Sequence, residues 1–86
     1  MNNQILQVKV MTPAKFLYYG QALSVSSKNS EGNFDILPEH ANFITLIENQ
    51  SIKVQKTDKK VLIYNFHQAI IMNTNNEVSI YAEPTT

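Results

Sequence analysis

The side chains in this sequence that could do chemistry are few and scattered. There are only two histidines, His40 and His67, 27 positions apart, and there is no cysteine. A metal site needs several imidazole, thiolate or carboxylate ligands close together, and neither histidine has a carboxylate pair at ligand spacing. We therefore expect neither a metal site nor a disulfide.

Three carboxylates, those of Glu31, Asp35 and Glu39, are the only candidates for an acid/base set. Alternation along an extended segment would place Glu31 and Asp35 on one face. The alternative, which we favour, is that all three are solvated loop charges beside a turn. The only glycines are Gly20 and Gly32, so there is no glycine-rich phosphate loop and no G-x-S-x-G serine motif. We expect no catalytic residue and no bound cofactor.

Length and charge exclude several classes of protein. The 86 residues fit one domain spanning 1–86, and seven lysines balance seven acidic residues with no arginine. Nucleic-acid binding and electrostatic membrane anchoring both need a cationic excess, so we expect neither. The N-terminus shows no signal peptide, and the longest apolar runs, of about five residues, are too short to span a membrane.

The elements that must position these side chains are β-strands. Apolar residues alternate with polar ones around residues 6–10, 23–26, 52–55 and 78–80, which predicts four half-buried strands. Residues 43–47, 61–66 and 69–72 are nearly continuous apolar runs, rich in β-branched and aromatic residues. They predict strands that are covered on both faces or are edges docked on a partner.

Turn-forming residues separate these strands at regular intervals. The predicted turns are Thr12-Pro13, Gly20, Lys28–Gly32, Pro38, Glu48–Ser51, Thr57–Lys60 and Asn73–Glu77. Turn signals spaced by about 8–12 residues are typical of an all-β sandwich or barrel.

The most distinctive segment runs from Gly32 to Ala41, with the sequence GNFDILPEHA. Gly32 fits a turn, Phe34 and Ile36 alternate as in a short strand, and Pro38 would end that strand. Two interpretations of His40 are equally open on these residues. Its ring caps nearby backbone groups in a loop, or it faces a partner.

Three blocks of the sequence resemble, in the same order, the N-terminal domain of the epsilon subunit of F-type ATP synthases, called delta in mitochondria. The blocks are LQVKVMTPAK at 6–15 followed by residues 17–20, SEGNFDILPEHANFIT at 30–45, and EVSIYAE at 77–83. The second is close to the family pattern EGxFGILPxHAPLIT and the third to NxVTILAE. Together they cover nearly the whole chain, and the middle block is the most specific.

This resemblance implies an all-β fold, a two-sheet antiparallel β-sandwich, and a non-catalytic rotor subunit of an F-type ATP synthase. Such a subunit would bind gamma, rest on the polar loops of the c-subunit ring, and meet the alpha/beta catalytic head indirectly. It would be cytoplasmic, and peripheral to the inner face of the cell membrane through the complex. Residue-by-residue carry-over places Glu31, Gly32, Asn33 and His40 in the ring- and stalk-facing loop, and Thr12 and Thr45 near the gamma-facing edge.

The sequence also departs from the family pattern, mainly in loops. The departures are Asp35 for the second glycine of the middle block, Asn42 for the proline after His-Ala, His67-Gln68 for a Gly-Gly pair, and Glu48-Asn49-Gln50 for a Pro-Gly turn. We expect asparagine to adopt the left-handed conformation there, or the loops to be repacked. Many relatives continue into a C-terminal helical hairpin, whereas this sequence stops at Thr86, so we expect neither the hairpin nor its inhibitory role.

Two other functions are compatible with the residues. The altered glycines and the missing hairpin favour an epsilon-like subunit of a specialised rotary ATPase that binds gamma but meets no proton ring. A small sandwich that binds a ligand or carbohydrate belongs to another class. Its site would use exposed tyrosines, and the candidates are Tyr18, Tyr19, Tyr64 and Tyr81.

Overall fold

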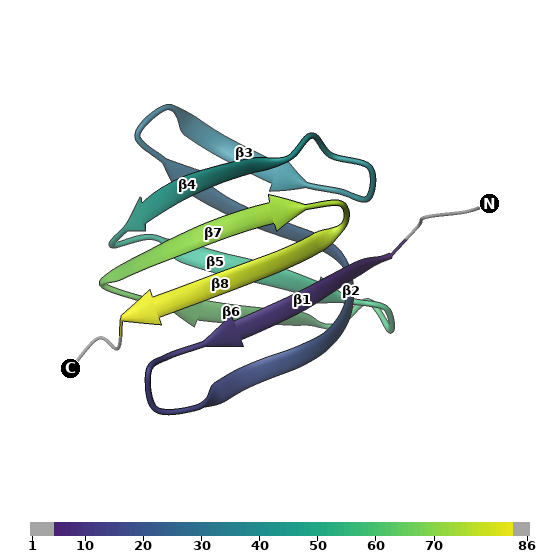
Figure 1. The fold of residues 1–86 in the computed structure, drawn as a ribbon, viewed down its shortest axis with the longest axis horizontal. Coiled ribbons are helices and arrows are strands. Elements are labelled where there is room, and N and C mark those ends of the chain that lie inside the picture. Colours follow the sequence, from purple (N-terminus) through teal and green to yellow (C-terminus); the bar gives the residue numbers. More distant parts are fainter. Residues whose placement is uncertain (1–4, 84–86) are drawn as a thin grey trace.

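The computed structural model describes residues 5–83, which form eight β-strands and no helix. The strands are β1 (Leu6–Met11), β2 (Phe16–Asn29), β3 (Gly32–Ile36), β4 (Phe43–Glu48), β5 (Ser51–Lys56), β6 (Val61–Asn65), β7 (Gln68–Thr74) and β8 (Glu77–Glu83). Within these residues no helix is long and apolar enough to cross a membrane. The expected all-β sandwich is confirmed (Figure 1).

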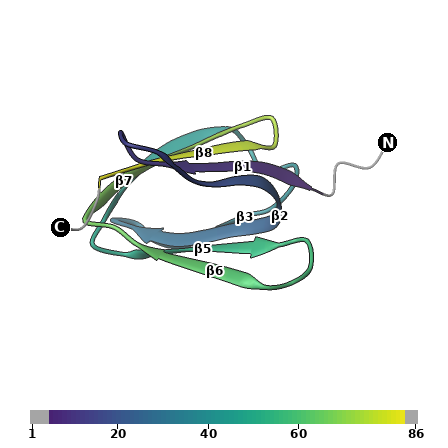
Figure 2. The same ribbon diagram turned by 90° about the horizontal axis from the view of Figure 1, so that it is seen from below.

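The longest strand, β2, belongs to both layers of the sandwich. Its first half pairs with β1, where Gly20 lies opposite Val8. Its second half pairs with β3 and β5, and Val25 lies opposite both Ile36 and Val54. The strand order is β4-β7-β8-β1-β2-β5-β6, with β3 also paired to β2. The sheet therefore curls over at β2, and Figure 2 shows β7, β8 and β1 in one layer above β3, β5 and β6 in the other.

The first and last strands pair side by side in the first layer. β1 and β8 run parallel, with Val10 opposite Ile80, whereas the other pairings among residues 5–83 are antiparallel. β8 follows β7 in a hairpin and lies between β7 and β1. The first and last strands are thus joined by a ladder of backbone hydrogen bonds, and the two ends of the described chain lie at opposite ends of this pair.

Alternate residues of the strands fill the space between the layers. The fully buried side chains include Leu6, Val8, Val10, Val25, Ile36, Ile47, Ile52, Val54, Ile71 and Ile80. Each such side chain contributes about 1.5–3 kcal/mol through burial alone. The alternation predicted around residues 6–10 and 52–55 is confirmed. Around 23–26 it is wrong, because the register shifts between Ala22 and Ser24 and Leu23 is only half-buried. Around 78–80 the predicted polar position, Ser79, is itself buried.

The turn predicted at Gly20 is wrong. Gly20 lies inside β2, and the strands expected on either side of it are one continuous strand of 14 residues. A Cβ atom at this position would lie only 3.1 Å from the hydroxyl oxygen of Tyr18, which itself donates a hydrogen bond to the carbonyl of Gln21 at 2.6 Å. Glycine is therefore used here for the close approach of a side chain, not for a turn.

The three apolar runs are not covered on both faces within this chain. Ile47 and Ile71 are fully buried, whereas their neighbours Leu46 and Ile70 are 49% and 42% exposed. The first of our two expectations for these runs is therefore wrong. Two of the runs, β4 and β6, stand at the ends of the strand order, as edge strands do.

Asparagine residues form several of the tight turns. Asn49, Asn75 and Asn76 have φ angles of 55°, 50° and 64°. The left-handed backbone expected of asparagine in place of glycine is thus confirmed at Asn49. The turn between β2 and β3 is shorter than predicted, because β2 continues to Asn29.

Replacement of Ile71 by alanine should remove core packing and lower the free energy of unfolding by about 2–5 kcal/mol. The matched control is Ile70→Ala on the next residue, whose side chain lies on the outer face and whose loss should cost about 1 kcal/mol or less. Urea denaturation followed by circular dichroism measures both. Equal losses for the two variants would contradict the assignment of inner and outer faces.

Candidate partner-binding surfaces

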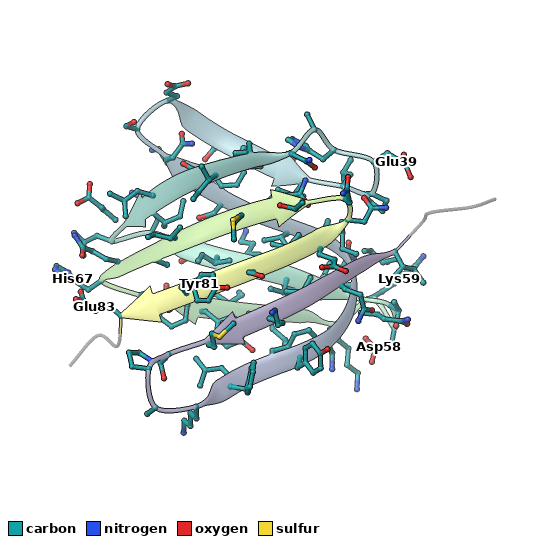
Figure 3. All side chains as sticks on the ribbon, viewed as in Figure 1. Glu39, Asp58, Lys59, His67, Tyr81 and Glu83 are labelled. Carbon is teal, nitrogen blue, oxygen red and sulfur yellow. The ribbon has the colours of Figure 1, made fainter. Side chains whose placement is uncertain are left out.

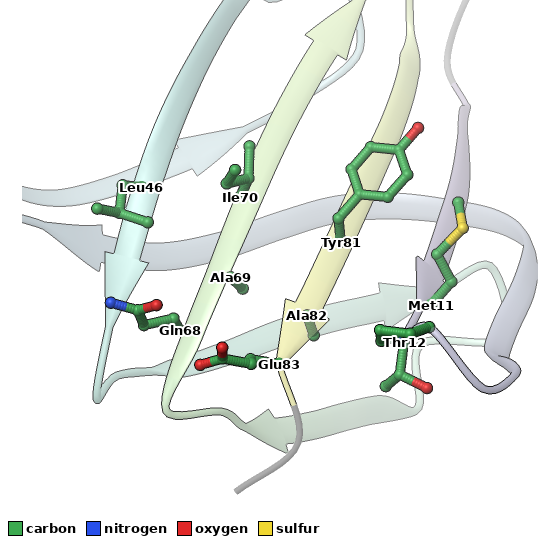
Figure 4. Close-up of a pocket in the computed structure, with 10 residues that line it drawn as sticks. Met11, Thr12, Leu46, Gln68, Ala69, Ile70, Tyr81, Ala82 and Glu83 are labelled. Atoms are coloured by element: carbon green, nitrogen blue, oxygen red, sulfur yellow. The ribbon is translucent and has the colours of Figure 1, made fainter.

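The outer face of the first layer carries a row of apolar side chains that crosses four strands. Leu46 on β4 lies opposite Ile70 on β7, Ile70 lies opposite Tyr81 on β8, and Tyr81 lies opposite Met11 on β1. Figure 4 shows these four side chains on the same side of the sheet. Side chains directly opposite each other in neighbouring strands are in contact distance, so the row is a continuous apolar surface.

A second row on the same face is apolar at only one end. Ile44 lies opposite Met72, Met72 opposite Ser79, and Ser79 opposite Lys9. The apolar region is therefore widest over β4 and β7. We call it the apolar face, defined as Met11, Ile44, Leu46, Ile70, Met72 and Tyr81.

One end of the apolar face is hollowed into a groove of about 430 Å³. Thr12, Pro13, Gln68 and Glu83 border this groove, which Figure 4 shows in close-up. The Thr12 hydroxyl accepts the backbone N–H groups of Ala14 and Lys15, both at 3.3 Å, and so fixes the loop between β1 and β2. Thr12 therefore borders the apolar groove; its contact with gamma stays a prediction.

The outer face of the second layer is mainly polar. Lys53 and Gln55 on β5 are followed across the sheet by Ile63 and Val61 on β6. On the same face, Ser26 on β2 donates a hydrogen bond to the carboxylate of Asp35 on β3. Exposed apolar side chains on this face are confined to the edge strand β6, so the two outer faces differ in chemistry.

Thr45 lies on the edge strand β4, but its side chain points away from the apolar face. It alternates with Ile44 and Leu46, and its hydroxyl oxygen accepts a hydrogen bond from Nδ2 of Asn29 at 2.9 Å. This bond ties β4 to the end of β2. Thr45 thus stabilises the edge strand β4 through its hydrogen bond with Asn29. A direct contact with gamma would require another orientation of the Thr45 side chain.

The residues carried over to a single ring- and stalk-facing loop lie at two places. Glu31, Gly32 and Asn33 are in or beside the turn before β3, whereas His40 follows the end of β3. The five residues of β3 separate the two by about 17 Å, at about 3.3 Å per residue. Figure 1 shows the two connections at opposite ends of β3. The contacts of these four residues with partners stay predictions.

The His40 ring caps a backbone group, as one of our two interpretations expected. Its Nδ1 lies 2.8 Å from the carbonyl oxygen of Ala41, and its ring centroid lies 5.1 Å from that of Phe43. Because a carbonyl oxygen can only accept, this contact requires a proton on Nδ1, and in the neutral ring Nε2 is then an acceptor. A contact between His40 and a partner remains compatible with this geometry.

The residues considered for chemistry do not converge. Within residues 5–83 no three potential metal ligands come together. Asp35 is on β3, between the turn of Glu31 and the loop of Glu39, and Figure 3 shows Glu39 and His67 at opposite ends of the molecule.

The four tyrosines do not form one binding face. Tyr18 and Tyr64 pack against the core, whereas Tyr19 and Tyr81 are exposed on the outer face. Burial raises the pKa of both Tyr18 and Tyr64 above its ordinary value, and the Asp58 carboxylate adds to the effect on Tyr18. This division removes the geometric basis for a tyrosine-lined ligand site.

A family model described as ATP synthase, Delta/Epsilon chain, beta-sandwich domain matches residues 5–85. The chain belongs to this family. The resemblance of the three sequence blocks is thereby confirmed.

Relatives in the delta/epsilon family include two bacterial proteins named ATP synthase epsilon chain. The one from Sulfurimonas denitrificans is 43% identical over 56 residues, which are 65% of this chain and 43% of that protein. The one from Clostridium kluyveri is 28% identical over 80 residues, which are 93% of this chain and 61% of that protein. This chain thus spans about half the length of the relatives it matches.

Chains in two solved structures share this fold. A chain of the Euglena gracilis mitochondrial ATP synthase, solved as OSCP/F1/c-ring, superposes with a TM-score of 0.84 and 14% identity over 92% of this chain and 51% of that one. A chain of the central stalk and c-ring of the Tetrahymena thermophila mitochondrial enzyme gives 0.74 and 13%, over 95% and 66%. At these identities the match shows the fold.

The departures from the delta/epsilon pattern are compensated by hydrogen bonds between loops. Asn42 accepts the N–H of Asn75 through its Oδ1 at 2.9 Å. Nδ1 of His67 lies 3.0 Å from Oδ1 of Asn49, whose own N–H donates to the His67 carbonyl at 2.9 Å. Two segments that have each lost glycines therefore hold each other, and this pairing was not visible in the sequence.

Proposed function

We propose that this chain is a non-catalytic rotor subunit of an F-type ATP synthase and that its apolar face binds the gamma subunit. The observation that carries the proposal is the row Leu46, Ile70, Tyr81 and Met11, in which three exposed apolar side chains and the half-buried Met11 lie directly opposite one another. Soluble monomers seldom expose a wide contiguous apolar surface without a partner to cover it. Relatives named epsilon chain support gamma as that partner.

The proposed work is mechanical, because a rotor subunit transmits force through contact. It needs a body that does not deform and two surfaces that bind different partners. The curled sheet supports the first requirement, since β2 links both layers and the core between them is filled. The apolar face and the polar loops support the second, and the c-subunit ring is the partner we assign to one set of loops. The subunit would then be peripheral to the membrane through the complex.

Glu31 and His40 lie beyond opposite ends of β3, so we treat their proposed contacts with partners separately. A single short loop of a partner does not reach both ends of β3, which are about 17 Å apart. We therefore assign the turn at Glu31 and the loop at His40 to two different contacts, one with the c-subunit ring and one with the stalk.

Replacement of Ile70 by glutamate should abolish binding to gamma by placing a charge in the middle of the apolar face. We expect the dissociation constant to rise by about a hundredfold or more, since a central buried contact is lost and a carboxylate is desolvated. Isothermal titration with purified gamma, and a thermal melt of each variant, provide the measurement.

The matched control is Ile63→Glu, which introduces the same charge at a 58% exposed isoleucine on the polar outer face. It should bind gamma normally. Normal binding by Ile70→Glu, or equal loss for both variants, would contradict the assignment of gamma to the apolar face.

Charge reversal at Glu31 and removal of the His40 ring test the polar contacts separately. We expect Glu31→Lys and His40→Ala each to fold normally and each to reduce the recovery of a different partner. Affinity purification from the native cell, with quantitative mass spectrometry of gamma and c subunits, measures this. If both variants recover both partners in full, the carried-over residues are not contacts. Recovery of gamma without any c subunit, even for the unaltered chain, would indicate a rotary ATPase that is not coupled to a ring.

A further inference from the structure

Asn73 is a polar residue at a position of β7 whose side chain points into the core. Along β7 it follows Ala69 and Ile71 on the inward side, and it is only 1% exposed. Its Oδ1 has no hydrogen-bond partner among the described residues, whereas Nδ2 donates to the carbonyls of Ala41 and His40 at 3.1 and 3.3 Å. Burial of an amide is unfavourable, so these two bonds, not packing, account for an asparagine here.

Two more asparagines join the same loop to the turn between β7 and β8. Oδ1 of Asn76 accepts the N–H of Glu39 at 2.7 Å, and Oδ1 of Asn42 accepts the N–H of Asn75 at 2.9 Å. Glu39 has a φ angle of 71°, in the left-handed region that is unfavourable for glutamate, so its conformation depends on such contacts. We call Asn42, Asn73 and Asn76 the asparagine clasp.

The clasp holds the backbone of the loop at three groups, the Glu39 N–H and the carbonyls of His40 and Ala41. The N–H of His40 donates to the Leu37 carbonyl at 3.0 Å, and Nδ1 of His40 is held by the Ala41 carbonyl, which Asn73 also holds. Among the described residues, no hydrogen bond reaches the Nε2 atom of His40 or the carboxylate of Glu39. Both residues line a hollow of about 390 Å³ that the loop forms with Asn75 and Asn76.

We propose that the asparagine clasp presets the loop of residues 37–42 so that His40 and Glu39 accept hydrogen bonds from a basic side chain on a polar loop of a partner protein. The charge of the loop supports a basic partner, because residues 37–42 contain one carboxylate, that of Glu39, and no lysine. This partner rests on the proposed rotor function, whereas the clasp itself is a property of the free chain. Asn73 is thus a positioning residue that acts through His40.

Amide hydrogen exchange in the free protein tests the clasp without any partner. The first variant is Asn73→Val, which suits the inward side of β7 and removes the Nδ2 donor. The second is Asn76→Gly, which removes the acceptor of the Glu39 amide and still permits the left-handed φ of 64° at this position. We expect exchange of the Glu39 and Asn75 amides to rise about tenfold in both variants, while the amides of β1 and β5 stay protected.

Histidine ring ¹⁵N spectra add a signature that a purely structural role would not move. In the unaltered protein we expect the neutral His40 ring to carry its proton on Nδ1, and in Asn73→Val we expect that tautomer to lose its dominance. The control is Asn65→Ala, an exposed asparagine whose Oδ1 accepts from Ser51 and which should change neither measurement. Unchanged exchange and an unchanged tautomer in Asn73→Val and Asn76→Gly would overturn the clasp.

Partner binding then tests the second half of the proposal. Asn73→Val and His40→Ala should each weaken binding to the isolated rotor assembly of gamma and c subunits at least about tenfold. Normal binding by an Asn73→Val variant with a disordered loop would overturn the positioning role. If the unaltered chain binds no rotor subunit, the rotor function fails, and the exchange result decides the clasp on its own.

Discussion

The double membership of β2 is the constraint on which the rest of this structure depends. A chain of 86 residues has little apolar material, and two separate small sheets would leave many edges open. One strand of 14 residues that pairs with β1 in one layer and with β3 and β5 in the other reduces the number of open edges. It also fixes the two layers covalently, so that the apolar face and the polar loops keep a constant relation to each other.

Most strands were predictable because polar residues mark the side that faces water. In β1 and β5, lysine and glutamine alternate with valine, leucine and isoleucine, and the period of two is plain. In β4 and β7 the outward positions hold Leu46 and Ile70, so both faces are apolar and the period disappears. The sequence could not show which face of these two strands is exposed. The apolar outward residues that remove the alternation are the same residues that form the apolar face.

The candidate site was less predictable, because it depends on contacts between distant segments. Glu31 and His40 lie nine positions apart in one motif, yet a strand separates them. Gly20 was predicted to be a turn residue, because the close approach of the Tyr18 side chain to this position leaves no local pattern in the sequence. Asn73 was grouped with the turn that follows it. Its place two residues beyond Ile71 in the inward alternation was the signal that could have identified it as buried.

The net charge of zero conceals an uneven distribution that bears on how such a subunit would find its place. The segment 31–48 contains Glu31, Asp35, Glu39 and Glu48 without a lysine, whereas the hairpin of β5 and β6 contains Lys53, Lys56, Lys59 and Lys60 against Asp58 alone. The apolar face holds no charged side chain of its own. Because charges direct approach and orientation more than they add affinity, the basic hairpin and the acidic residues spread along segment 31–48 are suited to align the domain. Under the proposed function the apolar face would then supply the binding free energy, since removal of its side chains from water depends little on direction. Separation of these two tasks over different surfaces is what a part held by two partners at once requires.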